Sequence, residues 1–171
     1  MAYAIGFQPG NVFTTADRQK GKGGSAALGT IFTDSQGRVF QMVMVGASQN
    51  LTNGLAVTIN ASTYLTVLGT VPGGGVPNVG PVGLVWCSIT ASTSTLVWMQ
   101  IYGLCNIATF AASASATPGA AVKFGADGSL TAVGVTTASA YIAGITCAAT
   151  NSVISSAVGS VFLNYPKAIG G

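Results

Sequence analysis

The sequence Leu96-Val97-Trp98-Met99-Gln100-Ile101-Tyr102-Gly103 lies just past the middle of the 171-residue chain and decides its fold class. It is rich in β-branched, aromatic and other apolar residues and nearly free of polar ones. A short apolar run of this kind is typical of a strand that is buried on both faces. Gly, Ser, Thr and Ala surround it on both sides, as in chains of short strands and tight turns. The sequence therefore predicts an all-β protein.

Several blocks of sequence recur in the same order after Val45. The corresponding segments are 53–59 and 118–124, 64–69 and 129–134, 82–86 and 143–147, and 97–101 and 161–165. The first two pairs share one offset, since Gly54 and Gly119, and likewise Gly69 and Gly134, are 65 positions apart. This order predicts two small β-barrel or sandwich-like modules that arose by internal duplication. Chance similarity in a chain of low complexity is the alternative.

The expected organisation has three parts. Residues 1–29 lack helical or strand periodicity and are interpreted as an extended arm. Residues 30–107 form the first module, which begins with a hairpin whose turn is Asp34-Ser35-Gln36-Gly37. Residues 108–171 form the second module, and the segment 108–116 is interpreted as a linker or an edge strand rather than a helix. Within these modules, 72–78 is expected to be an exposed loop and 125–128 a hairpin turn.

Composition excludes most catalytic machinery. Only 5% of the residues are charged, there is no His, and Asp and Glu together number three. Triads that contain His are therefore excluded, and Asp17, Asp34 and Asp127 lie in the arm and in turns, where carboxylates commonly cap or stabilise the backbone. Neither a His/Cys cluster nor an acidic loop predicts a metal, and no motif predicts a cofactor. We therefore expect a protein that is not an enzyme.

Two groups of residues are candidates for contact with partners. Arg18, Lys20 and Lys22, interspersed with glycine, form a basic segment that is either a solvated tail or a contact for phosphate or an acidic surface. They are too localised for a nucleic-acid-binding face, so no direct nucleic-acid partner is expected. The second group is aromatic, and filling β cores or subunit interfaces is favoured over lining a carbohydrate site. Its members are Trp86, Trp98, Tyr102, Phe162 and Tyr165.

The remaining signals concern the compartment. Cys87, Cys105 and Cys147 each lie in an apolar, strand-like context, which favours buried free thiols and a reducing compartment. The mean hydropathy is high, at +0.59. No uninterrupted apolar run reaches the roughly 18 residues of a spanning helix, so no membrane partner is expected. Charge depletion instead favours a protein that buries much of its surface against other proteins.

The chain resembles the decoration (cement) proteins of tailed-bacteriophage capsids over residues 28–166. The residues that carry the resemblance are Gly54-Leu55-Ala56-Val57, Pro81-Val82-Gly83-Leu84, Gly119-Ala120-Ala121-Val122, Ala143-Gly144-Ile145, and the segment from Leu28-Gly29-Thr30 to Gly37-Arg38-Val39-Phe40. The low charge and the two modules depart from the commoner single-module form.

The resemblance implies a structural virion protein on the outer capsid surface, assembled in the host cytoplasm, whose partner is the major capsid protein. A homo-oligomer is expected, with a trimer favoured. The contact residues expected are Arg18, Lys20 and Lys22 with the five aromatic residues named above. The alternatives are another virion component (a fibre base, a tail component or a coat subunit) or a carbohydrate-binding β-module that uses Trp86 or Trp98.

Overall fold

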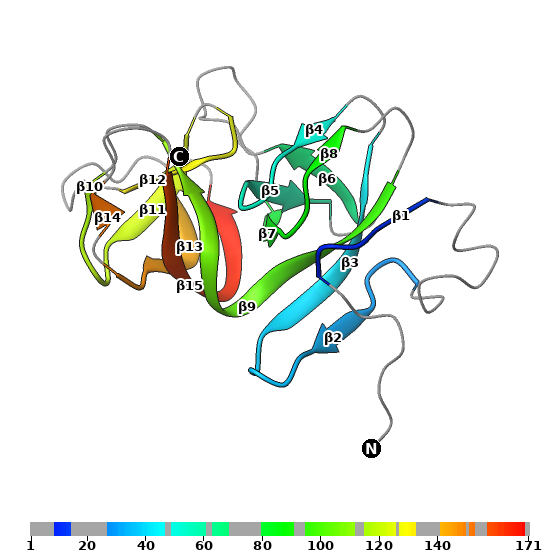
Figure 1. Ribbon diagram of the computed structural model, residues 1–171, viewed down its shortest axis with the longest axis horizontal. Helices are drawn as coiled ribbons and strands as arrows, with labels where there is room; N and C mark the ends of the chain where they lie inside the picture. Colours follow the sequence, from blue (N-terminus) through cyan, green and yellow to red (C-terminus); the bar gives the residue numbers. More distant parts are fainter. Residues whose placement is uncertain are drawn as a thin grey trace.

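The computed structural model describes residues 9–14, 27–46, 49–60, 63–68, 80–90, 95–111, 115–125, 127–132, 141–149, 151–152 and 157–169. These residues form strands and no helix, which confirms the predicted all-β class (Figure 1). It follows that no helix among them could span a membrane.

The described residues contain fifteen strands. Those that precede the central stretch are β1 (Val12–Thr14), β2 (Ile31–Thr33), β3 (Val39–Val45), β4 (Asn50–Leu51), β5 (Ala56–Ile59), β6 (Leu65–Leu68), β7 (Gly80–Val85) and β8 (Ile89–Thr90). The central stretch belongs to β9 (Thr95–Phe110), and after it come β10 (Ser115–Ala116), β11 (Ala121–Phe124), β12 (Leu130–Ala132), β13 (Tyr141–Cys147), β14 (Asn151–Ser152) and β15 (Ala157–Ile169).

The main sheet contains two closed rings of paired strands that share β9. In the first ring the strands pair in the order β3, β9, β7, β5, β6 and back to β3. In the second ring the order is β9, β15, β13, β11, β12 and back to β9. The two orders are the same when β9 takes the place of β3 and β15 takes the place of β9. The short pairs β4–β8 and β10–β14 also correspond.

Matching turns strengthen this correspondence. In the first ring the amide of Gly54 donates to the carbonyl of Val85, and the Val85 amide donates to Leu55. In the second, Gly119 donates to Cys147, and Cys147 donates to Ala120. Both glycines have a left-handed φ, at +86° and +81°. An internal repeat predicts this match, and descent of the two rings from one duplicated unit stays a prediction.

The structure aligns the later blocks differently from the sequence. The matching hydrogen bonds make Val85 the equivalent of Cys147. Val85 is opposite Met99 in the β7–β9 pair, and Cys147 is opposite Val161 in the β13–β15 pair, so Met99 is equivalent to Val161. The sequence pattern equates Val97 with Val161 instead. Apolar residues occupy both faces of these strands, so a shift of register leaves the apolar pattern almost unchanged.

Burial along β9 follows from its position in two rings. Residues 95–101 are all buried, as the apolar stretch predicts. Val97, Met99 and Ile101 pack inside the first ring, while Leu96 and Trp98 pack on its outer side against the β2 segment and β1. Ala108 and Phe110, in the segment interpreted as a linker or edge strand, lie within the core of the second ring. The expected module boundary at 107/108 therefore falls inside a continuous strand.

The first part of the predicted arm is a strand in the structure. Val12–Thr14 pairs antiparallel with Val97–Thr95 as β1, and Phe13 packs on the cluster that holds Leu96 and Trp98. The hairpin of β2 and β3 forms with its turn at 34–37, as predicted. Residues 1–8, 15–26 and the predicted loop 72–78 lie outside the described residues.

The two rings are also joined by direct bonds. The Ala56 amide donates to the Gly128 carbonyl at 2.8 Å, and the Thr109 amide donates to the Gly54 carbonyl at 2.9 Å. Lys167 and Ala168 of β15 pair with Pro81 and Gly80 of β7. Residues of β5 and β7 enter the same core cluster as the second ring, so the core is continuous across the junction.

Candidate functional site

Three of the predicted contact residues meet at the junction of the rings. The Tyr102 ring lies 5.2 Å from that of Tyr165 and 6.3 Å from that of Phe162, between ring centroids. The antiparallel pairing of β9 with β15 brings them together, since Asn164 is opposite Tyr102 and Phe162 is opposite Leu104. Phe162 is 45% exposed, Leu104 49% and Tyr165 59%. An aromatic and aliphatic cluster is therefore open to solvent.

The backbone at this cluster is irregular in both strands. Gly103 has φ of +92°, and Tyr165 has φ of +47°. The left-handed region is unusual for a bulky side chain and costs roughly 1–2 kcal/mol. Tyr165 thus stands exposed in a backbone conformation that glycine would adopt without strain. Strained residues of this kind concentrate at functional sites.

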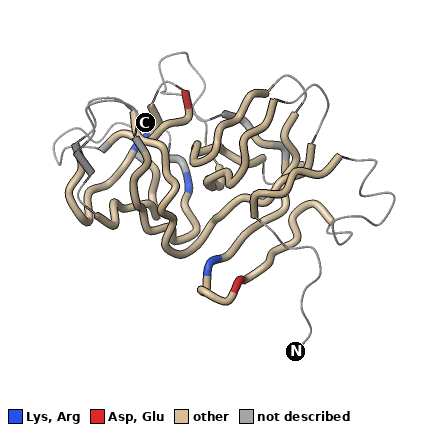
Figure 2. Tube along the Cα trace, viewed as in Figure 1, with Lys and Arg blue, Asp and Glu red and all other residues tan. Residues whose placement is uncertain are grey.

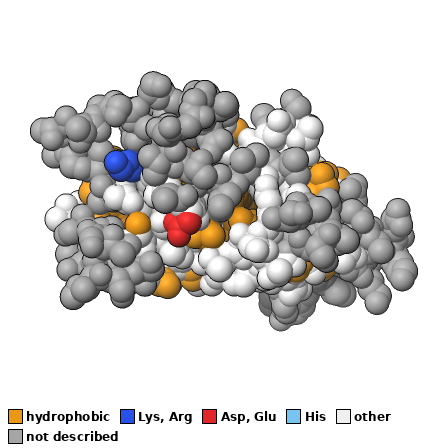
Figure 3. Space-filling model, turned by 90° about the horizontal axis from the view of Figure 1, so that it is seen from above, with side chains coloured by type: hydrophobic (Ala, Val, Ile, Leu, Met, Phe, Trp, Pro, Cys, Tyr) orange, Lys and Arg blue, Asp and Glu red, His pale blue; other side chains and the backbone are white. Residues whose placement is uncertain are grey.

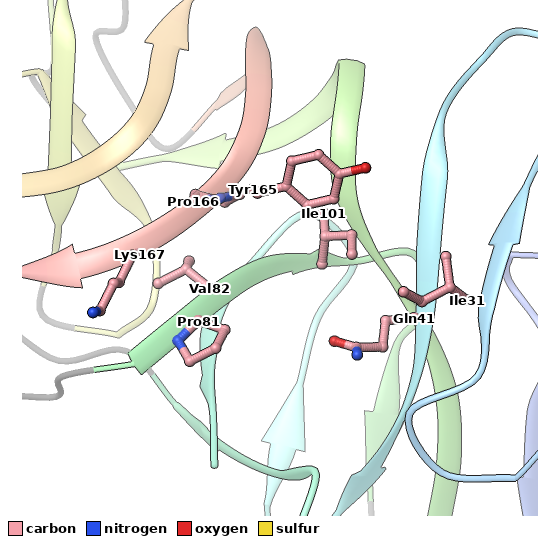
Figure 4. Close-up of a pocket in the computed structure, with 8 residues that line it drawn as sticks. All are labelled: Ile31, Gln41, Pro81, Val82, Ile101, Tyr165, Pro166 and Lys167. Carbon is pink, nitrogen blue, oxygen red and sulfur yellow. The ribbon is translucent and has the colours of Figure 1, made fainter. Parts of the chain in front are cut away.

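An apolar groove of about 330 Å³ lies beside Tyr165. Its lining comes from β2 and β3, from β7 and β9, and from β15, so both rings contribute (Figure 4). The lining residues are Ile31, Gln41, Pro81, Val82, Ile101, Tyr165, Pro166 and Lys167. Ile31 is 59% exposed, and Lys167 is the one charged residue among them. We call Ile31, Tyr102, Leu104, Phe162 and Tyr165 the junction surface.

The two tryptophans have different surroundings. Trp98 is 4% exposed and packs on the outer side of the first ring, with its ring 6.3 Å from that of Phe32. Trp86 is half-buried beneath the Arg38 guanidinium, whose Cζ lies 4.7 Å from the indole ring centroid. Both residues therefore contact the chain itself, as the core interpretation favours. Burial of Trp98 removes it from the surface on which a glycan would stack.

Gln100 holds the junction from inside. It is fully buried, and its amide Nε2 donates to the carbonyls of Tyr102 and Leu104 at 3.0 and 3.1 Å. Its Oε1 accepts from Trp86 Nε1 at 2.9 Å. The side chain thereby satisfies the two carbonyls that flank Gly103, where β9 passes from the first ring to the second.

Charged residues are few along the described chain (Figure 2), but two border the junction surface, since Lys167 lines the groove and Arg38 lies against Gly103. The described charged residues are Asp34, Arg38, Lys123, Asp127 and Lys167. Arg38 pairs with Asp34 at 2.6 Å at the tip of the β2–β3 hairpin. Burial alone would raise the pKa of Asp34, but hydrogen bonds and the charge of Arg38 hold it below its usual value. On the face drawn in Figure 3, hydrophobic side chains of the described residues lie among uncharged ones, and the described charges there form two small spots.

Asp127, Cys87 and Cys105 are engaged within the fold. Asp127 accepts from the amide and hydroxyl of Ser129 in the β11–β12 turn, and these bonds lower its pKa. Burial raises the pKa of the Cys87 and Cys105 thiols to about 11. Within the described ranges no three His, Cys, Asp or Glu residues gather as metal ligands. The junction surface can thus bind by apolar burial and aromatic contact.

The sequence identified part of this surface. It named Tyr102, Phe162 and Tyr165, while Arg18, Lys20 and Lys22 lie outside the described residues. It missed Ile31 and Leu104, because apolar residues in strands look alike whether they face a core or solvent. No protein-family model matches the chain, and no curated protein is significantly similar to it.

Proposed function

We propose that this protein is a structural accessory protein of a viral shell, specifically a decoration (cement) protein of a tailed-phage capsid. The observation that carries the proposal is the junction surface, where the side chains of four large apolar residues are 45–59% exposed. These residues are Ile31, Leu104, Phe162 and Tyr165. Exposed apolar patches of this kind mark surfaces that bind other proteins. The major capsid protein is the proposed partner.

The energetics of the junction surface suit this role. Aromatic and aliphatic anchors beside a groove are typical centres of protein interfaces. Each large apolar side chain contributes about 1.5–3 kcal/mol when it is fully buried. Many copies on a repetitive lattice would each add such a contact and stabilise the shell. The family resemblance supports the assignment to a capsid.

The test first asks whether a neighbouring reading frame encodes a major capsid protein, and then uses empty shells assembled from that protein. Purified protein is added to the shells, and bound protein is measured by co-sedimentation and located by electron cryo-microscopy. We expect regular occupancy of the outer surface. Absence of binding, or binding only at a tail or fibre vertex, would contradict the decoration role.

Matched variants test the surface itself. Phe162→Asp and Ile31→Asp each place a carboxylate on the junction surface, whereas Thr90→Asp places one on exposed β8 away from it. We expect the first two to weaken binding by about tenfold or more, which corresponds to about 1.4 kcal/mol, and the third to leave it unchanged. Equal effects of all three variants would dismiss the junction surface as the contact.

The basic segment makes a different prediction from the junction surface. Binding by apolar burial changes little with salt, whereas contacts made by Arg18, Lys20 and Lys22 weaken as salt screens them. Replacing all three with Ser and repeating the titration at low and high salt separates the two contributions. If binding is lost in the triple variant and at high salt, the arm rather than the junction surface supplies the contact.

A further inference from the structure

The correspondence of the two rings reveals a strand position that is filled in one ring and open in the other. In the first ring β1 pairs with the start of β9, where Phe13 is opposite Leu96. On its other side this part of β9 pairs with β3. The start of β9 therefore has a strand on each side.

The equivalent place in the second ring is the start of β15. Ala157, Val158 and Gly159 pair with Phe110, Thr109 and Ala108 of β9, as Thr95, Leu96 and Val97 pair with β3. The register of β13 begins at Val161, and the Ala148 amide reaches only the Ser160 carbonyl. No other described strand pairs with residues 157–159. Their second edge corresponds to the one that β1 occupies.

Burial differs at these matched positions. Leu96 is 2% exposed, in the cluster against which Phe13 of β1 packs. Val158, its counterpart, is 67% exposed and is the most exposed of the large hydrophobic residues described. Equivalent positions of the two rings therefore carry apolar side chains with different burial. Leu96 is covered in the first ring, and Val158 is exposed in the second.

We propose that the edge at Ala157–Gly159 binds residues 3–7 of a second copy of this chain as an added strand. Residues 1–8 precede the described part and contain no charged residue. Residues 1–29 as a whole lack strand periodicity, but within residues 3–7 Tyr3, Ile5 and Phe7 alternate with Ala4 and Gly6, so a strand there would place its large side chains on one face. That face would cover the side chain of Val158, which is 67% exposed. The chain's own β1 already shows this mode of addition to the first ring.

Reach favours a second copy over the same one. Gly10 lies against Trp86 of the first ring, since a Cβ there would be 3.4 Å from the Trp86 carbonyl oxygen. The three residues from Phe7 to Gly10 span at most about 10 Å. Figure 1 shows β1 beside the first ring, whereas β15 lies in the second. We therefore assign the edge at Ala157–Gly159 to the N-terminal segment of another copy, and the test below decides between the two copies.

Such a contact is head-to-tail, because the N-terminal segment and the β15 edge are different surfaces. Head-to-tail contacts of identical subunits close into rings when the rotation allows it, and a trimer is one such ring. Backbone hydrogen bonds supply affinity in strand addition, and side-chain fit supplies specificity. The contact deepens the proposed role as an oligomeric capsid protein. Its test needs no capsid, so the two proposals can fail separately.

Sedimentation velocity of the full chain over a wide concentration range measures the oligomer. We expect an oligomer for the wild type and for Thr90→Asp, which places a carboxylate on exposed β8. We expect a monomer for Val158→Asp and for deletion of residues 2–8, with circular dichroism spectra unchanged. A wild type that stays monomeric, or a deletion that leaves the oligomer intact, would overturn the proposal.

A peptide of residues 1–8 identifies the acceptor edge directly. Added to the deletion variant, it should slow amide hydrogen exchange at residues 157–159, and Val158→Asp should abolish this protection. In excess it should also dissociate the wild-type oligomer. Protection of residues 157–159 in a monomeric full chain would show that the same copy fills the edge, which would refute the second copy as occupant.

Discussion

Replacing Gly54 with alanine should destabilise the protein far more than the equivalent Gly119→Ala substitution. Both glycines lie in the same turn with a left-handed φ. A Cβ on Gly119 would meet nothing within 4 Å, whereas one on Gly54 would overlap the Ile107 carbonyl oxygen and lie 2.8 Å from Thr109 Oγ1. Gly119→Ala therefore measures the cost of backbone strain alone, whereas Gly54→Ala measures the same strain together with the loss of contact between the turn and β9.

The magnitudes follow from these contacts. Strain alone should cost Gly119→Ala about 1 kcal/mol of unfolding free energy. To admit a Cβ at Gly54, the turn must move off β9 and break two bonds, Thr109 N–H to the Gly54 carbonyl and Thr109 Oγ1 to the Asn53 carbonyl. At about 1 kcal/mol for each bond, plus the strain, Gly54→Ala should cost about 3 kcal/mol.

Urea unfolding followed by circular dichroism measures both variants. Thr109→Val removes only the side-chain bond and should cost about 1 kcal/mol, which gives a second measurement if Gly54→Ala does not fold. If the two alanine variants lose equal stability, the turn at Gly54 does not pack on β9 as described.

Three further predictions concern buried polar groups and titration. Gln100→Leu should lower the free energy of unfolding in urea by about 3 kcal/mol, because it leaves the carbonyls of Tyr102 and Leu104 and the Trp86 indole without their partner. As a control, Gln41→Leu should change that free energy by less than about 0.5 kcal/mol. The three buried cysteines should resist an exposed-thiol reagent in the native state and react only on unfolding, and fast native reaction would contradict their burial. The lowered pKa of Asp34 contributes stability above its unfolded value of 3.8, and this contribution is lost as pH falls through the lower folded value. With no His in the chain, unfolding free energy should stay nearly constant between about pH 5 and 8 and fall in acid; the raised pKa values of the Cys87 and Cys105 thiols, about 11 when folded, should lower it again in alkali.

The sequence predicted the local features well. The β2–β3 hairpin, the turn between β11 and β12 and the buried stretch in β9 depend on residues close together in the chain. Turn residues and β-branched or aromatic runs carry their preference locally, so a pattern is enough to find them. The candidate site was only partly predictable. Tyr102 and Trp98 lie four residues apart in one strand, yet one lines an open cluster and the other a core.

Register and bulges decide that difference. The register of β9 with β3 shifts between Gln100 and Tyr102, and this irregularity changes the alternation of side chains between the two faces. Whether an apolar side chain is covered then depends on a distant segment, as β1 covers Leu96 and nothing described covers Val158. A local sequence pattern does not predict such long-range pairing.

By itself, therefore, the sequence determined the all-β class, the repeated turns and the scarcity of titratable groups, since each follows from residue type and short spacing. Only the tertiary structure decided that one strand serves two rings and that Tyr102, Phe162 and Tyr165 form one surface. Pairing between strands far apart in the chain fixes which faces are buried, and the free energy of that pairing belongs to the whole fold rather than to any one segment.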